Sequence, residues 1–161
     1  MSVEHKSIQI RPVRVEDRQA VMALVSRLGE GLPEWTDPDA VVEAARQWLA
    51  GYFTPEQDHP GAVFVAEGEG EVVGVVSVNT RRHFTGSMEA YIGELAVAPH
   101  TARTGLGRRL LSTAEDWARE QGVSQMTLET AASNTTARRF YAAAGYREEA
   151  IRFTRALDQP V

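Results

Sequence analysis

Two glycines at alternate positions, Gly105 and Gly107, stand where a proline-containing turn leads into a long segment of helical apolar periodicity. The first amides of a helix have no intrahelical partner and lie at the positive end of its dipole. Glycines let an anion approach this backbone without meeting a Cβ atom. Arg103, Arg108 and Arg109 add positive charge. The junction therefore predicts a site for a phosphate or pyrophosphate, the alternative being a helix start that binds nothing.

Other site motifs do not fit these residues. A P-loop would need a lysine where Arg108 stands, and a dinucleotide fingerprint would need a third glycine where Leu110 stands. There is no cysteine, and none of the four histidines shows the i,i+4 spacing with a carboxylate that helical zinc sites use. Ser77 and Ser87 lie near no histidine or Gly-x-Ser-x-Gly elbow. We therefore expect neither a metal site nor a serine hydrolase.

A second candidate cluster begins at Ser133 and Asn134, either of which could cap a helix that ends at Gly145. Spacings of three and seven residues place Ala137 and Tyr141 on the same helix face as Asn134. A tyrosine hydroxyl there could give a proton or a hydrogen bond to a leaving group. The alternative is a core aromatic residue whose hydroxyl reaches the surface.

The segments that must position these residues alternate between the apolar/polar alternation typical of strands and the apolar spacing of three and four residues typical of helices. They predict one α/β domain over residues 1–161 without repeats or linkers. Asp37 before Pro38 is a typical helix start. The expected strands cover 8–11, 62–66, 72–78, 90–97, 125–130 and 150–157, and the expected helices cover 16–28, 38–51, 105–121 and 134–144.

Composition limits the partners of the chain. The net charge of −5 argues against non-specific nucleic-acid binding, which needs a basic surface. No apolar run is long enough to span a bilayer, and the N-terminus has no signal-peptide pattern. The absence of cysteine suits a reducing cytoplasm, so we expect a cytoplasmic protein without nucleic-acid or membrane partners.

The two clusters together resemble the GNAT superfamily of N-acetyltransferases. Its acetyl-CoA motif is a strand ending in Leu-x-Val-x-Pro, followed by Arg/Gln-x-x-Gly-x-Gly/Ala and a helix. Its second motif, Asn-x-x-Ala-x-x-Phe-Tyr-x-x-x-Gly-Phe/Tyr, matches the segment from Asn134 to Tyr146. One departure is Ala102, which stands where the family usually has Arg or Gln. The resemblance implies a GNAT-type α+β fold, a mixed and mostly antiparallel sheet of about six to seven strands flanked by about four helices.

The resemblance also implies where the co-substrate acetyl-CoA binds. Backbone amides from Arg103 to Arg108 would hold the pyrophosphate, and the backbone from Leu95 to Val97 would bind the pantetheine arm and the acetyl carbonyl. Tyr141 would lie near the sulfur. The full set of implied cofactor-binding residues is Leu95, Ala96, Val97, Arg103, Thr104, Gly105, Leu106, Gly107, Arg108, Asn134, Ala137 and Tyr141.

A base is also expected, because the attacking amine must lose a proton. Glu94 is the first candidate, Glu129 the second, and Tyr91 and Glu89 are weaker; a water chain or a solvated, salt-bridged Glu94 are alternatives. Alternation places Glu94 and Leu95 on opposite faces of their strand, unless a β-bulge changes the pattern.

The function implied is acetyl transfer from acetyl-CoA to a primary amine of a small molecule or peptide, by direct attack in a ternary complex. One alternative is a non-catalytic module that binds coenzyme A as a sensor or regulator, and another is an unrelated phosphate-binding α/β protein. The acceptor region in the family corresponds to residues 30–37 and 81–84, where acidic residues and Trp35 would suit a cation. The alternative, which we place slightly ahead, is a solvated loop with a packed tryptophan. Family members often dimerise, so a homodimer is an open expectation.

Overall fold

A five-stranded sheet with the strand order β1-β2-β3-β4-β5 forms the centre of the fold. The computed structural model describes residues 7–54 and 59–158. Neighbouring strands are antiparallel except β4 and β5, which are parallel. The mixed, mostly antiparallel sheet agrees with the prediction, with fewer strands than expected. The strands are β1 (Gln9–Pro12), β2 (Gly61–Gly68), β3 (Glu71–Arg82), β4 (Met88–Val97) and β5 (Met126–Leu128).

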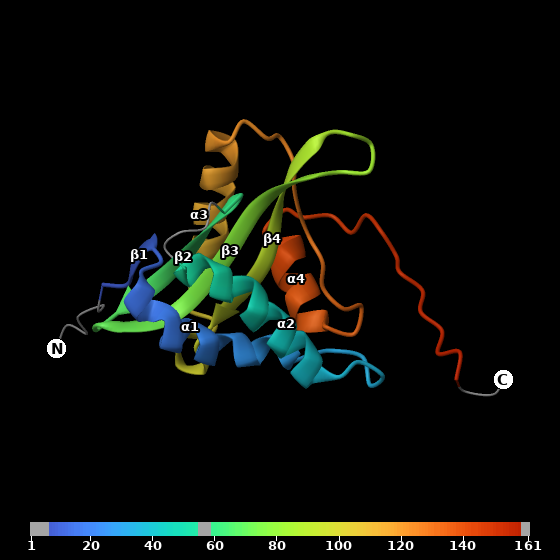
Figure 1. Cartoon of the computed structure of the whole chain (residues 1–161), viewed down its shortest axis with the longest axis horizontal. Coiled ribbons are helices and arrows are strands. Elements are labelled where there is room, and N and C mark those ends of the chain that lie inside the picture. Colours follow the sequence, from blue (N-terminus) through green and yellow to red (C-terminus); the bar gives the residue numbers. More distant parts are fainter. Residues whose placement is uncertain (1–6, 55–58, 159–161) are drawn as a thin grey trace.

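Helices cover both faces of the sheet. Figure 1 shows α1 and α2 on one face and α3 and α4 on the other. Because it is covered on both sides, β3 is buried continuously from Val73 to Val78, which explains why apolar residues occupy neighbouring positions along it, with Ser77 as the polar exception. The helices are α1 (Arg18–Leu24), α2 (Pro38–Ala50), α3 (Leu106–Glu120) and α4 (Thr135–Ala143), and short 3-10 turns are η1 (Val15–Asp17), η2 (Val25–Gly29), η3 (Gly51–Phe53) and η4 (Pro99–Thr101).

Local sequence signals account for most helix ends. The Asp37 side chain accepts a 3.0 Å hydrogen bond from the Asp39 amide, and Pro38 follows as the first helical residue, as predicted. The helix predicted over 16–28 is present as η1, α1 and η2 in succession. On α3, the apolar stripe of Leu106, Leu110, Leu111, Ala114 and Ala118 is buried, which fixes this helix against the sheet.

A β-bulge interrupts the pairing of β3 and β4. Val78 lies opposite Ile92 and Val76 lies opposite Leu95, so Ser77 alone faces the two residues Gly93 and Glu94. This is the irregularity that would alter the alternation of side chains along β4. It brings Glu94 to a buried position, 7% exposed.

The strand predicted over 150–157 is wrong. Residues 144–158 contain no strand, and in Figure 1 this red segment runs away from the sheet. Ile151, Phe153 and Leu157 alternate as in a strand, yet they are 83%, 92% and 89% exposed. A period of two satisfies only the local requirement, since a strand also needs a partner with backbone groups to pair.

Candidate active site

The turn between β4 and α3 presents main-chain amides at a helix N-terminus. The first bond of the α3 ladder is donated by the Arg109 amide to the Gly105 carbonyl, at 3.1 Å, so the amides of Leu106, Gly107 and Arg108 precede the ladder. Gly105 has φ of 84° and Arg103 has φ of 63°, both in the left-handed region. This geometry suits an anion such as a pyrophosphate.

The two glycines of this turn have different roles. A Cβ on Gly105 would meet nothing within 4 Å, so glycine is needed there for its backbone conformation. A Cβ on Gly107 would lie 3.4 Å from the Phe140 ring, so this position lets α4 pack closely on α3. Gly105 thus shapes the turn that presents the amides, and Gly107 leaves room for the Phe140 ring between the two helices.

Two of the three arginines at this turn point elsewhere. Arg108 pairs with Glu115 at 3.1 Å, about two helical turns further along α3, and Arg109 donates a 2.8 Å hydrogen bond to the Ile8 carbonyl. Within residues 7–54 and 59–158, Arg103 forms no ion pair, and its side chain is exposed. Arg103 is therefore the arginine best placed to meet an anion from solvent.

The C-terminal half of β4 has one unpaired edge. Leu95, Ala96 and Val97 pair with β3, whereas β5 pairs only with the segment from Ala90 to Ile92. Beyond Ile92 the backbone edge facing away from β3 has no strand partner in the described part of the chain. An extended amide-containing chain such as pantetheine fits such an edge. Arg27 already donates a 2.7 Å hydrogen bond to the Val97 carbonyl there.

The N-terminus of α4 approaches the same region. The Asn134 side chain accepts a 3.1 Å hydrogen bond from the Ala137 amide, so Asn134 is the helix cap. Ser133 donates instead to the Gly31 carbonyl, at 2.8 Å. A Cβ on Gly31 would lie 2.7 Å from Asn134 Cγ, which shows how closely the loop after η2 packs here. The Asn134 oxygen is therefore already engaged, and its amide nitrogen is the group left for a ligand.

Tyr141 is half-buried on α4 among other aromatic rings. Its ring packs edge-on against Phe140 and Tyr146, with centroids 5.1 and 5.9 Å away. Burial, with a smaller effect of Tyr91, raises the pKa of Tyr141 to about 12. The phenol is thus protonated at neutral pH, as a proton donor to a thiolate must be.

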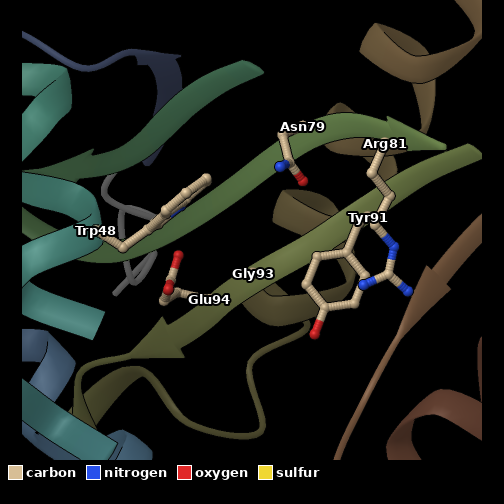
Figure 2. A pocket seen from close by; sticks show the side chains of 6 residues that line it. All are labelled: Trp48, Asn79, Arg81, Tyr91, Gly93 and Glu94. Atoms are coloured by element: carbon tan, nitrogen blue, oxygen red, sulfur yellow. The ribbon is translucent and has the colours of Figure 1, made fainter. Parts of the chain in front are cut away.

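The Glu94 carboxylate faces a pocket on the α2 side of the sheet. Burial raises the pKa of Glu94, and the hydrogen bond from Ser77 partly offsets this effect. Figure 2 shows the carboxylate in the cavity, with Trp48 on one side and Tyr91 on the other. The cavity has a volume of about 300 Å³ and is lined by Trp48, Asn79, Arg81, Tyr91, Gly93 and Glu94.

Charges around this pocket are already paired, apart from Glu94. Arg81 donates a 2.7 Å hydrogen bond to Glu89 and lies over the Tyr91 ring, 3.7 Å from its centroid (Figure 2). Glu89 is 2% exposed and is held in an ion pair with Arg81, so it is poorly suited to act as a base. The pocket therefore combines one carboxylate with two aromatic faces, a combination that attracts a cation.

Comparison with known proteins identifies the family of the chain. Residues 23–146 match the model of the acetyltransferase (GNAT) family. The chain belongs to the GNAT family. It is 30% identical over 150 residues to the aminoalkylphosphonate N-acetyltransferase of Salmonella typhimurium strain LT2, covering 92% of this chain and 91% of that protein.

Other GNAT relatives are similar over most of the chain. An uncharacterized N-acetyltransferase of Bacillus subtilis strain 168, YhfO, is 29% identical over 143 residues, which cover 88% of this chain and 91% of that protein. The aminoglycoside N-acetyltransferase AAC(6')-Iy, solved in complex with CoA, superposes with a TM-score of 0.72 at 21% identity, covering 98% and 99% of the two chains. Like these GNAT proteins, the chain is an acetyl-CoA-dependent N-acetyltransferase, and it transfers acetyl groups to an amine.

The acceptor region expected from the GNAT resemblance is only partly the region of the pocket. Arg81 lines the cavity, whereas Trp35 and Phe84 are 76% and 93% exposed and lie outside it. Trp48 and Asn79 line the cavity, although the sequence did not predict them as site residues. Trp48 lies on α2, is 46% exposed and borders the cavity.

Glu129 and a possible metal site were also considered from the sequence. Glu129, the second candidate for the GNAT base, is exposed and does not line the cavity. Within the described ranges, no group of three or more His, Asp or Glu side chains is arranged to hold a metal ion, and no helix is long and apolar enough to cross a membrane. The expectation that the enzyme uses no metal stays a prediction.

Proposed function

We propose that the chain transfers acetyl from acetyl-CoA directly to the primary amine of a small cationic molecule or peptide, with Glu94 as base and Tyr141 as acid. The observation that carries this proposal is the buried carboxylate of Glu94, which forms no ion pair within the described residues and lies in a cavity walled by Trp48 and Tyr91. An ammonium group is the natural complement of a carboxylate beside aromatic faces.

The co-substrate would be held by groups already described. Within the turn from Arg103 to Arg108, the amides of Leu106, Gly107 and Arg108 precede the α3 ladder and fit its pyrophosphate, and the unpaired edge from Leu95 to Val97 fits its pantetheine arm. Ala137 would let the arm lie against α4. When bound, acetyl-CoA supplies the activated acetyl group.

The residues of this chain then move two protons. Glu94 accepts the proton that the amine nitrogen loses as it bonds to the acetyl carbon, and the raised pKa makes this carboxylate a better proton acceptor. As the carbon–sulfur bond breaks, Tyr141 donates its hydroxyl proton to the thiolate. Tyr91 interacts with both groups: besides the larger effect of burial, its charge raises the pKa of Tyr141, and the charge of Glu94 raises the pKa of Tyr91.

Charge favours an acceptor without an anionic group beside its amine. Arg81 is the cation that lines the cavity, and Glu89 already neutralises it. Relatives support a small-molecule or N-terminal amine, since they include an aminoglycoside N(6')-acetyltransferase of Klebsiella aerogenes and a ribosomal protein bS18-alanine N-acetyltransferase of Escherichia coli. We therefore place multiply cationic amines ahead of aminophosphonates.

The test is a substrate panel with acetyl-CoA as donor. Binding of acetyl-CoA is first measured by calorimetry, and thiol release is then followed with aminoglycosides, polyamines, an aminoalkylphosphonate and an alanine N-terminal peptide. Each acceptor is matched by a control in which the amine is already acetylated. We expect release only with free primary amines and the highest kcat/KM with a cationic one. Uptake of acetyl-CoA without release for any amine would contradict the proposal.

A further inference from the structure

The bulge in β4 places a single serine opposite the proposed base. Ser77 on β3 faces both Gly93 and Glu94, because pairing is regular at Val76 and Val78 on either side of it. Ser77 is 1% exposed, so its hydroxyl is removed from water. A buried hydroxyl must find its hydrogen-bond partners within the protein.

Ser77 makes two hydrogen bonds to the same residue. Its Oγ accepts one from the Glu94 amide at 2.9 Å and donates one to Glu94 Oε2. A hydroxyl can do both because it carries one donor and two acceptor lone pairs. The backbone and the carboxylate of Glu94 are therefore tied to one atom. Among the described residues, Oε1 has no hydrogen-bond partner, so it is the oxygen left for a ligand in the cavity.

Gly93 keeps this arrangement possible. A Cβ at position 93 would lie 2.8 Å from Ser77 Oγ, closer than real contacts allow, and 3.8 Å from Trp48 Nε1 at the cavity wall. Any side chain at position 93 would displace the serine hydroxyl or distort the bulge. The bulge, the glycine and the serine thus form one unit around the Glu94 carboxylate.

We propose that Ser77 is a positioning residue. It anchors Oε2 of the ionised Glu94 carboxylate so that Oε1 is presented to the acceptor amine. This inference rests on the proposed function, in which Glu94 is the base. A hydrogen bond to a carboxylate favours the charged form, so it offsets the effect of burial and keeps the base available at lower pH.

Other titratable groups around Glu94 do not replace this contact. Tyr52 from η3 and Tyr91 from β4 feel the Glu94 charge, and both have raised pKa values chiefly because they are buried. Arg81 from β3 is held by Glu89. In the described part of the chain, no cationic side chain pairs with Glu94. Ser77 is therefore the side chain that fixes the orientation of the Glu94 carboxylate and offsets part of the effect of burial on its pKa.

The decisive experiment compares pH–rate profiles of kcat/KM for the wild type and Ser77→Ala. Without the hydroxyl the pKa of Glu94 rises further, so the acid limb should move to higher pH by about one unit. Activity should fall about tenfold on the acid side of the limb and recover at high pH, while the KM for acetyl-CoA stays the same. Ser77→Thr, which keeps a hydroxyl, should return the limb toward its original position.

A structural role alone would give a different result. Val78→Ala removes a buried side chain, 1% exposed, from the next position of the same strand. It should lower the melting temperature but leave the acid limb in place. If Ser77→Ala fails to fold, Ser77→Cys, a weaker donor, should give a smaller shift in the same direction. An acid limb unmoved in the folded serine variants would overturn the inference.

Failure of the proposed base looks different from failure of this inference. If Glu94→Gln removes the acid limb but Ser77→Ala leaves it unmoved, only the role of Ser77 is wrong. If Glu94→Gln leaves the profile unchanged, Glu94 is not the base and both proposals fall. Carboxyl NMR of the protein with ¹³C-labelled glutamate, assigned by loss of a signal in Glu94→Gln, follows the same pKa without turnover. It should show the same upward shift in Ser77→Ala.

Discussion

The guanidinium of Arg27 donates a 2.7 Å hydrogen bond to the backbone carbonyl of Val97, at the end of β4 that β5 leaves unpaired. Arg27 also pairs with Glu30, at 3.1 Å, in an exposed ion pair. It therefore occupies a carbonyl on the edge proposed for the pantetheine arm. A ligand that uses this carbonyl therefore competes with the arginine as hydrogen-bond donor.

This competition predicts that Arg27→Met binds acetyl-CoA more tightly, with a Kd lower by about threefold, because the ligand then replaces water instead of an arginine. Isothermal calorimetry measures the Kd directly. Glu30→Gln is the matched control, since it removes the exposed ion pair and leaves the bond to Val97; its Kd should not change. Weaker binding by Arg27→Met would show instead that Arg27 itself contacts the cofactor.

Tyr141 and Tyr146 offer a comparison between two tyrosines of one ring cluster. Tyr141→Phe should reduce kcat by about 100-fold, the usual size of a lost general acid, with little change in stability because no hydrogen bond of its hydroxyl is found among the described residues. The hydroxyl of Tyr146 instead contacts Glu115 at 3.2 Å and the Met126 sulfur at 3.1 Å. Tyr146→Phe should therefore lower the free energy of unfolding by about 1 kcal/mol and leave kcat nearly intact.

Steady-state kinetics and thermal unfolding of the two variants separate these roles. If Tyr141→Phe kept full activity over a range of pH, another group or water would protonate the thiolate. If Tyr146→Phe lost as much activity as Tyr141→Phe, the effect would come from the packing of the cluster and not from one hydroxyl.

Gly105 can be tested against a second glycine of the same helix. Gly105 and Gly122 flank α3, have φ of 84° and 77°, and have no atom within 4 Å of an added Cβ. Alanine at either position should cost about 1 kcal/mol of stability, because only glycine adopts this conformation freely. Only Gly105→Ala should also weaken acetyl-CoA binding, about tenfold, because it alters the turn that presents the amides. Equal Kd values for the two variants would remove Gly105 from the cradle.

The sequence could predict those parts of the site that lie within one continuous stretch of chain. The strand-turn-helix around Gly105 follows from local periodicity and glycine placement, and so does the cap of α4 at Asn134. The possible bulge at Glu94 could be foreseen, but its partner could not, since Ser77 is 17 residues away and becomes a neighbour only through strand pairing. The cavity was missed for the same reason: Trp48 and Asn79 belong to α2 and β3, and no local pattern brings them together.

The segment over 150–157, predicted as a strand, lies outside the sheet and the core. Phe153 is 92% exposed and follows the core without packing on it, so Phe153→Ala should change the free energy of unfolding by less than about 0.5 kcal/mol. Val76→Ala, at a fully buried position of β3, is the comparison and should cost about 2 kcal/mol, as large-to-small core changes do. Chemical denaturation at several protein concentrations measures both. A large, concentration-dependent loss for Phe153→Ala would mean that this segment packs against a second copy of the chain, which would support the homodimer that the family resemblance suggests.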